Sequence, residues 1–225
     1  MPRDTLDRQI QHLQDEVLLL GSMVEQAMLE AVDALKRRDL ETSKRIFNDD
    51  HLINEKRYAI ENAILILIAT QQPMARDLRL MAAILEVITE LERMGDYAKG
   101  VAKVCIRLGD SPLPLNLREF GTMADLAVNM LHRALGAFID ENPRQAYEIP
   151  NEDDKVDEIY NHIYRNLVSS MIADPEIIDQ ANLLMWVAHN IERMADRVTN
   201  ICERTVFIAT GELIEFDTDD EEDTE

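Results

Sequence analysis

Pairs of acidic side chains four residues apart are the feature of this sequence best suited to chemistry. Residues at this spacing on a helix lie about 40° apart around the axis and about 6 Å apart along it, so both carboxylates leave one helical face. Like charges placed this way repel by about 0.7 kcal/mol in water, and by more where solvent is partly excluded. A bound cation would offset the repulsion, and hard cations such as Mg²⁺, Mn²⁺ or iron prefer oxygen ligands. The pairs are Glu92/Asp96, Asp153/Asp157 and Glu192/Asp196, and Asp50/Asn54 is a weaker version in which an amide oxygen replaces one acid.

Ordinary ion pairs between helices are the other explanation of these acids. Arg93 and Arg193 neighbour the acidic pairs, and Arg193 lies three residues before Asp196. A single acidic pair on one helix is explained better in this way, whereas recurrence of the pattern on four segments favours metal binding. His189 lies three residues before Glu192 on nearly the same face, but a solvated histidine or one at the edge of the core is the more common case.

No catalytic motif accompanies the acids. The sequence has no phosphate-binding glycine loop, no nucleophile motif and no CxxC pair, so we expect the protein not to be an enzyme. The enzymatic alternative is a ferritin-like carboxylate bundle, which uses Glu-x-x-His on two helices. None of the five histidines has a glutamate three residues before it, which disfavours that alternative. A helical bundle with a purely structural role is the remaining possibility.

The acidic pairs recur because the sequence contains two copies of one unit. Residues 85–103 align with residues 185–203 at an offset of 100, and the letters ERM-x-D return in register. Residues 50–54 align with residues 153–157 at an offset of 103. A nearly constant offset is typical of an internal duplication. If the second and third helices of each copy lie side by side, four oxygen ligands converge between them.

The elements that carry the acids are expected to be helices almost throughout. Apolar residues recur every three or four positions, for example at Leu13, Val17, Leu20 and Val24. Long helices joined by short turns pack as antiparallel bundles, so the sequence predicts an all-α protein of six long helices in two tandem three-helix bundles. The expected helices cover about residues 4–37, 39–70, 74–108, 117–140, 143–172 and 175–210, within a first repeat (1–108), a linker with two prolines and a glycine (109–116), a second repeat (117–210) and an acidic tail (211–225).

The charge of the chain excludes several classes of partner. The net charge is −21, and residues 215–225 hold eight acids and no base, which leaves −13 on the rest of the chain. The tail is a charge run with no apolar face to bury, so we expect it to be disordered. An acidic surface repels nucleic acid and anionic membranes, so neither is an expected partner. Metal cations and basic patches on other proteins are the expected electrostatic partners.

We expect the protein in the cytoplasm. The first residues, MPRDTLDRQIQHL, contain no apolar signal core, and the longest apolar run, residues 63–69, is far too short to span a membrane. Cys105 and Cys202 each stand alone on a helical stretch, as expected of free thiols in a reducing compartment.

These motifs resemble the PhoU family, regulators of phosphate uptake found beside high-affinity phosphate transporters. The resemblance lies in residues 71–79 (QQPMARDLR), 91–96 (LERMGD) and 191–203 (IERMADRVTNICE) and in the DxxxN and DxxxD segments, and it covers the chain except for the acidic tail. It implies a homodimer with multinuclear clusters of iron, zinc, manganese or magnesium and a regulatory role without catalysis. It also implies contacts with the ATPase subunit of the phosphate transporter and with a phosphate-sensing histidine kinase, which restrain phosphate-starvation signalling when phosphate is plentiful.

The resemblance also implies which residues bind metal, and two departures from the family pattern distinguish the copies. The family's usual Gly-Asp-His reads Ala-Asp-Arg at residues 195–197, which places an arginine beside the second cluster. The first copy has Gly100 and Lys103 where the second has Asn200 and Glu203, so we expect the second copy to be the better metal site. The first site receives Asp50, Asn54, Asp77, Glu92 and Asp96, and the second receives Asp153, Asp157, Glu192 and Asp196, extended by Asn200 and Glu203.

Overall fold

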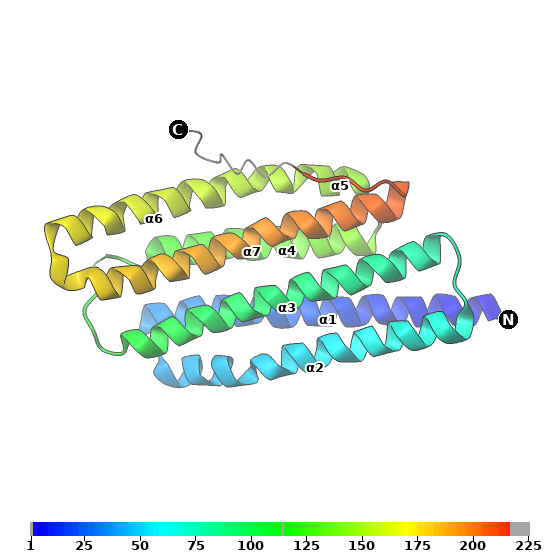
Figure 1. Ribbon diagram of the computed structural model, residues 1–225, viewed down its shortest axis with the longest axis horizontal. Helices are drawn as coiled ribbons and strands as arrows, with labels where there is room; N and C mark the ends of the chain where they lie inside the picture. The colour runs from blue at the N-terminus through cyan, green and yellow to red at the C-terminus, as the bar shows by residue number, and fades with distance from the viewer. Residues whose placement is uncertain (1, 114, 217–225) are drawn as a thin grey trace.

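The computed structural model describes residues 2–113 and 115–216, and within these ranges the chain is helical and contains no strand. Six helices of more than 20 residues carry the architecture (Figure 1), which confirms the predicted all-α fold. No helix in this part of the chain is both long and apolar enough to cross a membrane. The long helices are α1 (Pro2–Arg37), α2 (Leu40–Gln71), α3 (Arg76–Leu108), α4 (Arg118–Ile139), α6 (Asp153–Ala173) and α7 (Ile178–Thr210), and the short ones are α5 (Pro143–Glu148) and the 3₁₀ helices η1 (Pro150–Glu152) and η2 (Pro175–Ile177).

Local sequence determines where the first two helices meet. The α1 helix ends at Arg37, and Arg38 then adopts a positive φ of 59°. Asp39 caps α2, because its side chain accepts the N–H of Thr42 at 2.9 Å. The connection is therefore two residues long, and so short a turn makes α1 and α2 antiparallel neighbours.

The expected fifth helix, residues 143–172, is wrong in one respect, because the structure divides it near Pro150. Helix α5 ends at Glu148, η1 follows, and α6 begins at Asp153. Proline has no N–H to donate, and its ring clashes with the carbonyl four residues earlier, so a helix rarely passes through it unbroken. The division places Asp153 in the first turn of α6, with Asp157 one turn further along.

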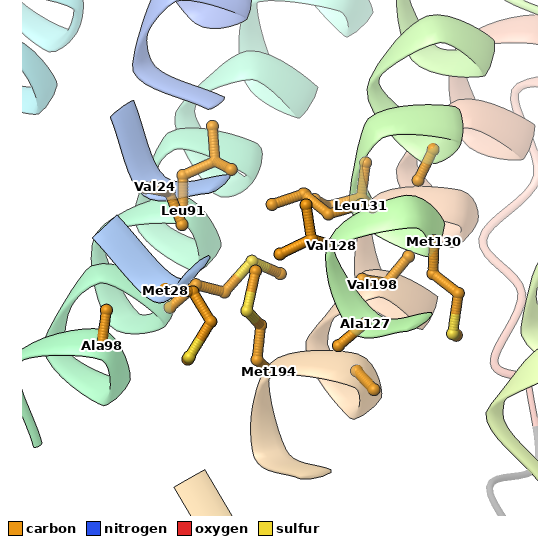
Figure 2. Packing of buried hydrophobic residues seen from close by; sticks show 14 of the residues in the cluster. Val24, Met28, Leu91, Ala98, Ala127, Val128, Met130, Leu131, Met194 and Val198 are labelled. Carbon is orange, nitrogen blue, oxygen red and sulfur yellow. The ribbon is translucent and has the colours of Figure 1, made fainter. Parts of the chain in front are cut away.

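The two copies share one hydrophobic core. Helices α1 to α3 form one bundle and α4, α6 and α7 form the other, while α3 packs on α7 and α1 packs on α4 (Figure 1). Figure 2 shows side chains from all four of these packing helices in one cluster, among them Met28 of α1 and Met194 of α7, both fully buried. Two bundles related by duplication are therefore confirmed, and they pack as one body with a continuous core.

A polar network also joins the copies between α3 and α7. Arg197 donates to Glu90 Oε2 and to the Tyr97 hydroxyl, each at 2.7 Å, and Asn200 donates to the same Glu90 oxygen at 3.2 Å. The side chains of Arg197 and Glu90 are only 16% and 12% exposed. Hydrogen bonds between charged groups this well buried fix how α3 lies against α7.

The structure differs from the expected tail over residues 211–216, which pack against the second copy. The ring of Phe216 meets the ring of Tyr147 edge-on, with 5.5 Å between centroids, and the Phe216 N–H donates to Glu203 Oε1 at 3.0 Å. Ile214 packs against the core from the same segment. Residues 217–225 of the expected tail lie outside the described residues.

Phe216→Ala should lower the free energy of unfolding by about 1–2 kcal/mol, because a partly buried aromatic ring loses its contact with Tyr147. Leu213→Ala is the matched control on the same segment. Leu213 is 68% exposed, so its truncation should change stability by less than about 0.5 kcal/mol. Urea unfolding followed by circular dichroism measures both variants, and equal effects would show that Phe216 does not anchor the segment.

Candidate metal centre

The second copy gathers four carboxylates between two helices. Asp153 and Asp157 lie at the start of α6, and Glu192 and Asp196 lie in the middle of α7, which packs against α6. Burial raises the pKa of Glu192 to about 8, and the charges of Asp196, Asp157 and Asp153 add to the rise while Arg193 opposes it. The pairs that the sequence places on separate helices therefore lie within electrostatic range of one another.

The carboxylates of α6 titrate abnormally for the same reasons. Burial raises the pKa of Asp153 to about 7, and Asp157, Asp196 and Asp154 raise it further. The pKa of Asp157 is also raised, first by burial and then by Asp154. Removal from water and neighbouring like charges both disfavour the charged form of an acid. The folded second copy therefore resists ionisation of this cluster unless a cation joins it.

Two oxygen atoms of the cluster, Asp153 Oδ1 and Glu192 Oε2, are buried without a hydrogen-bond partner. His189 Nδ1 lies 3.3 Å from Glu192 Oε2 without forming a hydrogen bond, and burial and then Arg193 lower the pKa of His189 and favour its neutral form. Arg193 bonds Asp196 at 3.1 Å, but no cation within residues 2–113 and 115–216 pairs with Asp153. Buried polar atoms nearly always have a partner, so unpartnered carboxylate oxygens point to one that the protein itself does not provide.

The donor set of the second copy fits a hard cation, since it consists of carboxylate oxygens, of which, in the described part of the chain, those of Asp196 alone are paired with an arginine. No three Asp, Glu, His or Cys side chains among the described residues already stand as ligands around one point. The residues that would hold an ion are the four carboxylates of α6 and α7, Asp153, Asp157, Glu192 and Asp196. When bound, the ion would supply the positive charge that the cluster lacks and tie the two helices together.

The first copy gathers the matching side chains around a lysine. Lys99 of α3 donates to Asp50 Oδ2 of α2 at 2.7 Å, lies 3.7 Å from Asp96 Oδ1, and has a raised pKa chiefly because of the hydrogen bond to Asp50. Asn54 donates to the same Asp50 oxygen at 3.4 Å. Glu92 belongs to this cluster too, since its pKa is raised by burial and then by Asp96. An ammonium group already supplies the positive charge here, so this set fits a metal less well.

Three of the predicted ligands are not brought into either cluster. Asp77 lies in the first turn of α3, about 22 Å along the helix axis from Glu92 and about 28 Å from Asp96. Asn200 donates to Glu90 of α3, and Glu203 accepts the N–H of Phe216. Asn200 and Glu203 therefore connect α7 to its other neighbours and do not face the acids of α6.

Lys99 is the residue of the site that sequence reasoning missed. It lies three residues after Asp96, a spacing that puts the two on one helical face, and this was the available signal. Its contact with Asp50 bridges 49 positions of sequence and depends on how α2 packs against α3. Local spacing alone cannot predict such a contact.

The PhoU domain family matches this chain twice, over residues 17–105 and 120–205. The two matched regions correspond to the two copies of the helical unit. Each contains the long helices that carry one acidic cluster.

Relatives from several bacteria match nearly the whole chain. The phosphate-specific transport system accessory protein PhoU homolog of Clostridium acetobutylicum is 32% identical over 217 residues, which are 96% of this chain and 99% of that protein. The phosphate-specific transport system accessory protein PhoU of Escherichia coli (strain K12) is 33% identical over 207 residues, 91% of this chain and 85% of that protein.

Two crystal structures share the fold. The phosphate transport system regulatory protein PhoU from Streptococcus pneumoniae superposes with a TM-score of 0.87 at 32% identity, covering 94% of this chain and 100% of that chain. PhoU from Pseudomonas aeruginosa superposes with a TM-score of 0.85 at 28% identity, covering 92% and 99%. With both copies matched and the relatives aligned over almost their full length, the chain belongs to the PhoU family.

Proposed function

We propose that this protein is an accessory and regulatory protein of a phosphate-specific transport system. The observation that carries the proposal is similarity along both copies to relatives with that name, from one end of the described helices to the other. In this role the protein acts in the cytoplasm as a homodimer. It contacts the ATPase subunit of the phosphate transporter and a phosphate-sensing histidine kinase, and it restrains phosphate-starvation signalling when phosphate is plentiful.

We further propose that metal ions held by the second copy take part in this role. The support is chemical: Asp153 and Glu192 each bury an unpartnered oxygen, and four carboxylates lie across one helix interface. Magnesium, manganese, iron or zinc would meet carboxylate oxygens there. A cation that ties α6 to α7 would also fix the outer faces of these helices, and long rigid helix faces are what a partner protein can recognise.

Deletion of the gene should leave phosphate-starvation genes switched on in phosphate-rich medium, because the restraint on the kinase is lost. Expression of the unchanged gene from a plasmid should restore repression. A starvation-promoter reporter measures both. Normal repression in a deletion strain that carries no second copy of the gene would refute the regulatory role.

Complementation of the same deletion strain with a variant tests the role of the metal separately from that of the protein. Complementation with an Asp153→Asn, Glu192→Gln variant should fail to restore repression although the variant accumulates as a folded protein. Full restoration by this variant would remove metal from the proposed function and leave the accessory role standing.

A further inference from the structure

We propose that Lys99 is a built-in cation that takes the place of metal in the first copy, so that metal binding is confined to the second copy. This inference rests on the metal-binding part of the proposed function and adds the residue that decides which copy is loaded. It is carried by the contacts of the Lys99 ammonium and by the difference between the copies at this one position.

The ammonium of Lys99 lies between an acid of α2 and an acid of α3 in the first copy. It lies 2.7 Å from Asp50 Oδ2 and 3.7 Å from Asp96 Oδ1, so it bridges the acids of α2 and α3. Asp50 is only 6% exposed, and its Oδ2 atom also accepts a hydrogen bond from the Asn54 side chain. The oxygen that a metal would need from α2 is thus already engaged by two donors.

A second contact holds the lysine in this position. Its ammonium lies 5.7 Å from the centre of the Phe47 ring, one turn before Asp50 on α2, and attraction between a cation and an aromatic face favours that placement. Lys99 is therefore held from α2 by a carboxylate and a ring, and from α3 by Asp96. A metal ion entering the same space would meet a fixed positive charge instead of free carboxylates.

The second copy has no equivalent ammonium. At the offset of 100 that aligns the copies, Thr199 corresponds to Lys99. Thr199 is buried, and its hydroxyl donates to the backbone carbonyl of Asp196 at 2.5 Å. The unpartnered oxygens of Asp153 and Glu192 lie in this copy, where the lysine is missing. The duplicated unit thus pairs Asp50 of one cluster with its own lysine and leaves Asp153, the matching acid of the other, open to an external ion.

The test is a gain of metal binding in the first copy, with Mn²⁺ as the probe. Protein stripped with a chelator is dialysed against Mn²⁺, and bound metal is measured by elemental analysis. The Asp153→Asn, Glu192→Gln variant, whose second cluster is disabled, should retain no bound Mn²⁺. Adding Lys99→Thr to that variant should bring back about one ion per chain, and further adding Asp50→Asn should remove it again. Lys44→Thr, which removes an exposed lysine of α2, should bring back none.

Two results would overturn the inference. One is Mn²⁺ that stays on the Asp153→Asn, Glu192→Gln variant and is lost on changing Asp50 to Asn while Lys99 is intact. The other is no gain from either Lys99→Thr or Lys99→Met in protein that circular dichroism shows to be folded. Lys99→Met keeps the aliphatic stem beside Phe47, which guards against loss of packing. Failure of the unchanged protein to bind Mn²⁺ would count against the metal part of the proposed function. The presence or absence of extra bound Mn²⁺ after Lys99→Thr would still decide this inference.

Discussion

The Asp153→Asn, Glu192→Gln variant should be more stable than the unchanged protein when metal is absent, and the difference should grow with pH. The folded state raises the pKa of Glu192 to about 8 from 4.5 and that of Asp153 to about 7 from 3.8. It therefore holds more protons than the unfolded state, so the stability of the metal-free protein falls as pH rises from about 4 to about 8. Amides carry no charge and escape this loss. Since a difference of one in pKa corresponds to about 1.4 kcal/mol for each group, the two groups together give an expected gain of several kcal/mol at pH 8 and little gain at pH 4.

Metal should reduce the difference in stability between the two proteins. An ion that binds only the folded state stabilises it by about 2.7 kcal/mol at one hundred times its dissociation constant. The unchanged protein should gain this stabilisation at pH 8, and the variant should not. Urea unfolding at pH 5 and pH 8, with a chelator and with Mn²⁺, gives all the comparisons. A variant that is less stable than the unchanged protein in chelator at pH 8 would contradict the assignment of this cluster.

The matched control is Asp50→Asn in the first copy, and it should act in the opposite direction. Asp50 is bonded to Lys99, so its neutralisation breaks a largely buried ion pair and leaves the ammonium short of a partner. We expect a loss on the order of 1–3 kcal/mol in chelator. The same substitution of Asp by Asn would thus stabilise one copy and destabilise the other.

Met194→Ala should destabilise the whole chain by about 3 kcal/mol, because truncation of a fully buried methionine leaves a cavity in the core. The core is continuous across the copies, so we expect both copies to lose stability together and to unfold in one transition. Met74→Ala is the matched control, since Met74 lies in the turn before α3 and is 79% exposed. Its effect should stay below about 0.5 kcal/mol.

The chain provides a probe for this experiment in Trp186, its single tryptophan, which lies in α7 of the second copy. Far-ultraviolet circular dichroism reports the helices of both copies, and tryptophan fluorescence reports the second. Coincident curves from the two probes, before and after Met194→Ala, are expected of one cooperative unit. A two-step dichroism curve of which only the step seen by fluorescence moves would show that the copies unfold separately.

Local sequence determined most of the fold. The three-to-four-residue spacing of apolar side chains along α1 predicts which of its faces is buried, and Asp39 marks the start of α2. The duplication is visible without any structure, because both copies keep their acids in register. Pro150 is a local signal for a break in a helix, and it divides the expected fifth helix.

Contacts between distant segments could not be predicted in the same way. Nothing local indicates that residues 211–216 fold back so that Phe216 meets Tyr147. That the two bundles share a core also follows only from the packing of α3 on α7 and of α1 on α4. These contacts depend on the shapes of whole helix surfaces, which a spacing rule does not describe.

The candidate site, like the fold, has features that the sequence determines and features that only packing decides. The sequence by itself determined that Asp153/Asp157 and Glu192/Asp196 each leave one face of a helix, because residues four apart always do so. Only the tertiary structure decided that the two pairs meet, that Asn200 turns toward α3, and that Lys99 reaches Asp50. The spacing along a helix is a property of the local backbone, whereas the element that covers a face is decided by packing between residues far apart in the chain. That packing, acting on two copies with similar acids, leaves Asp153 and Glu192 of the second cluster each with an unpartnered oxygen and gives Asp50 of the first one a lysine.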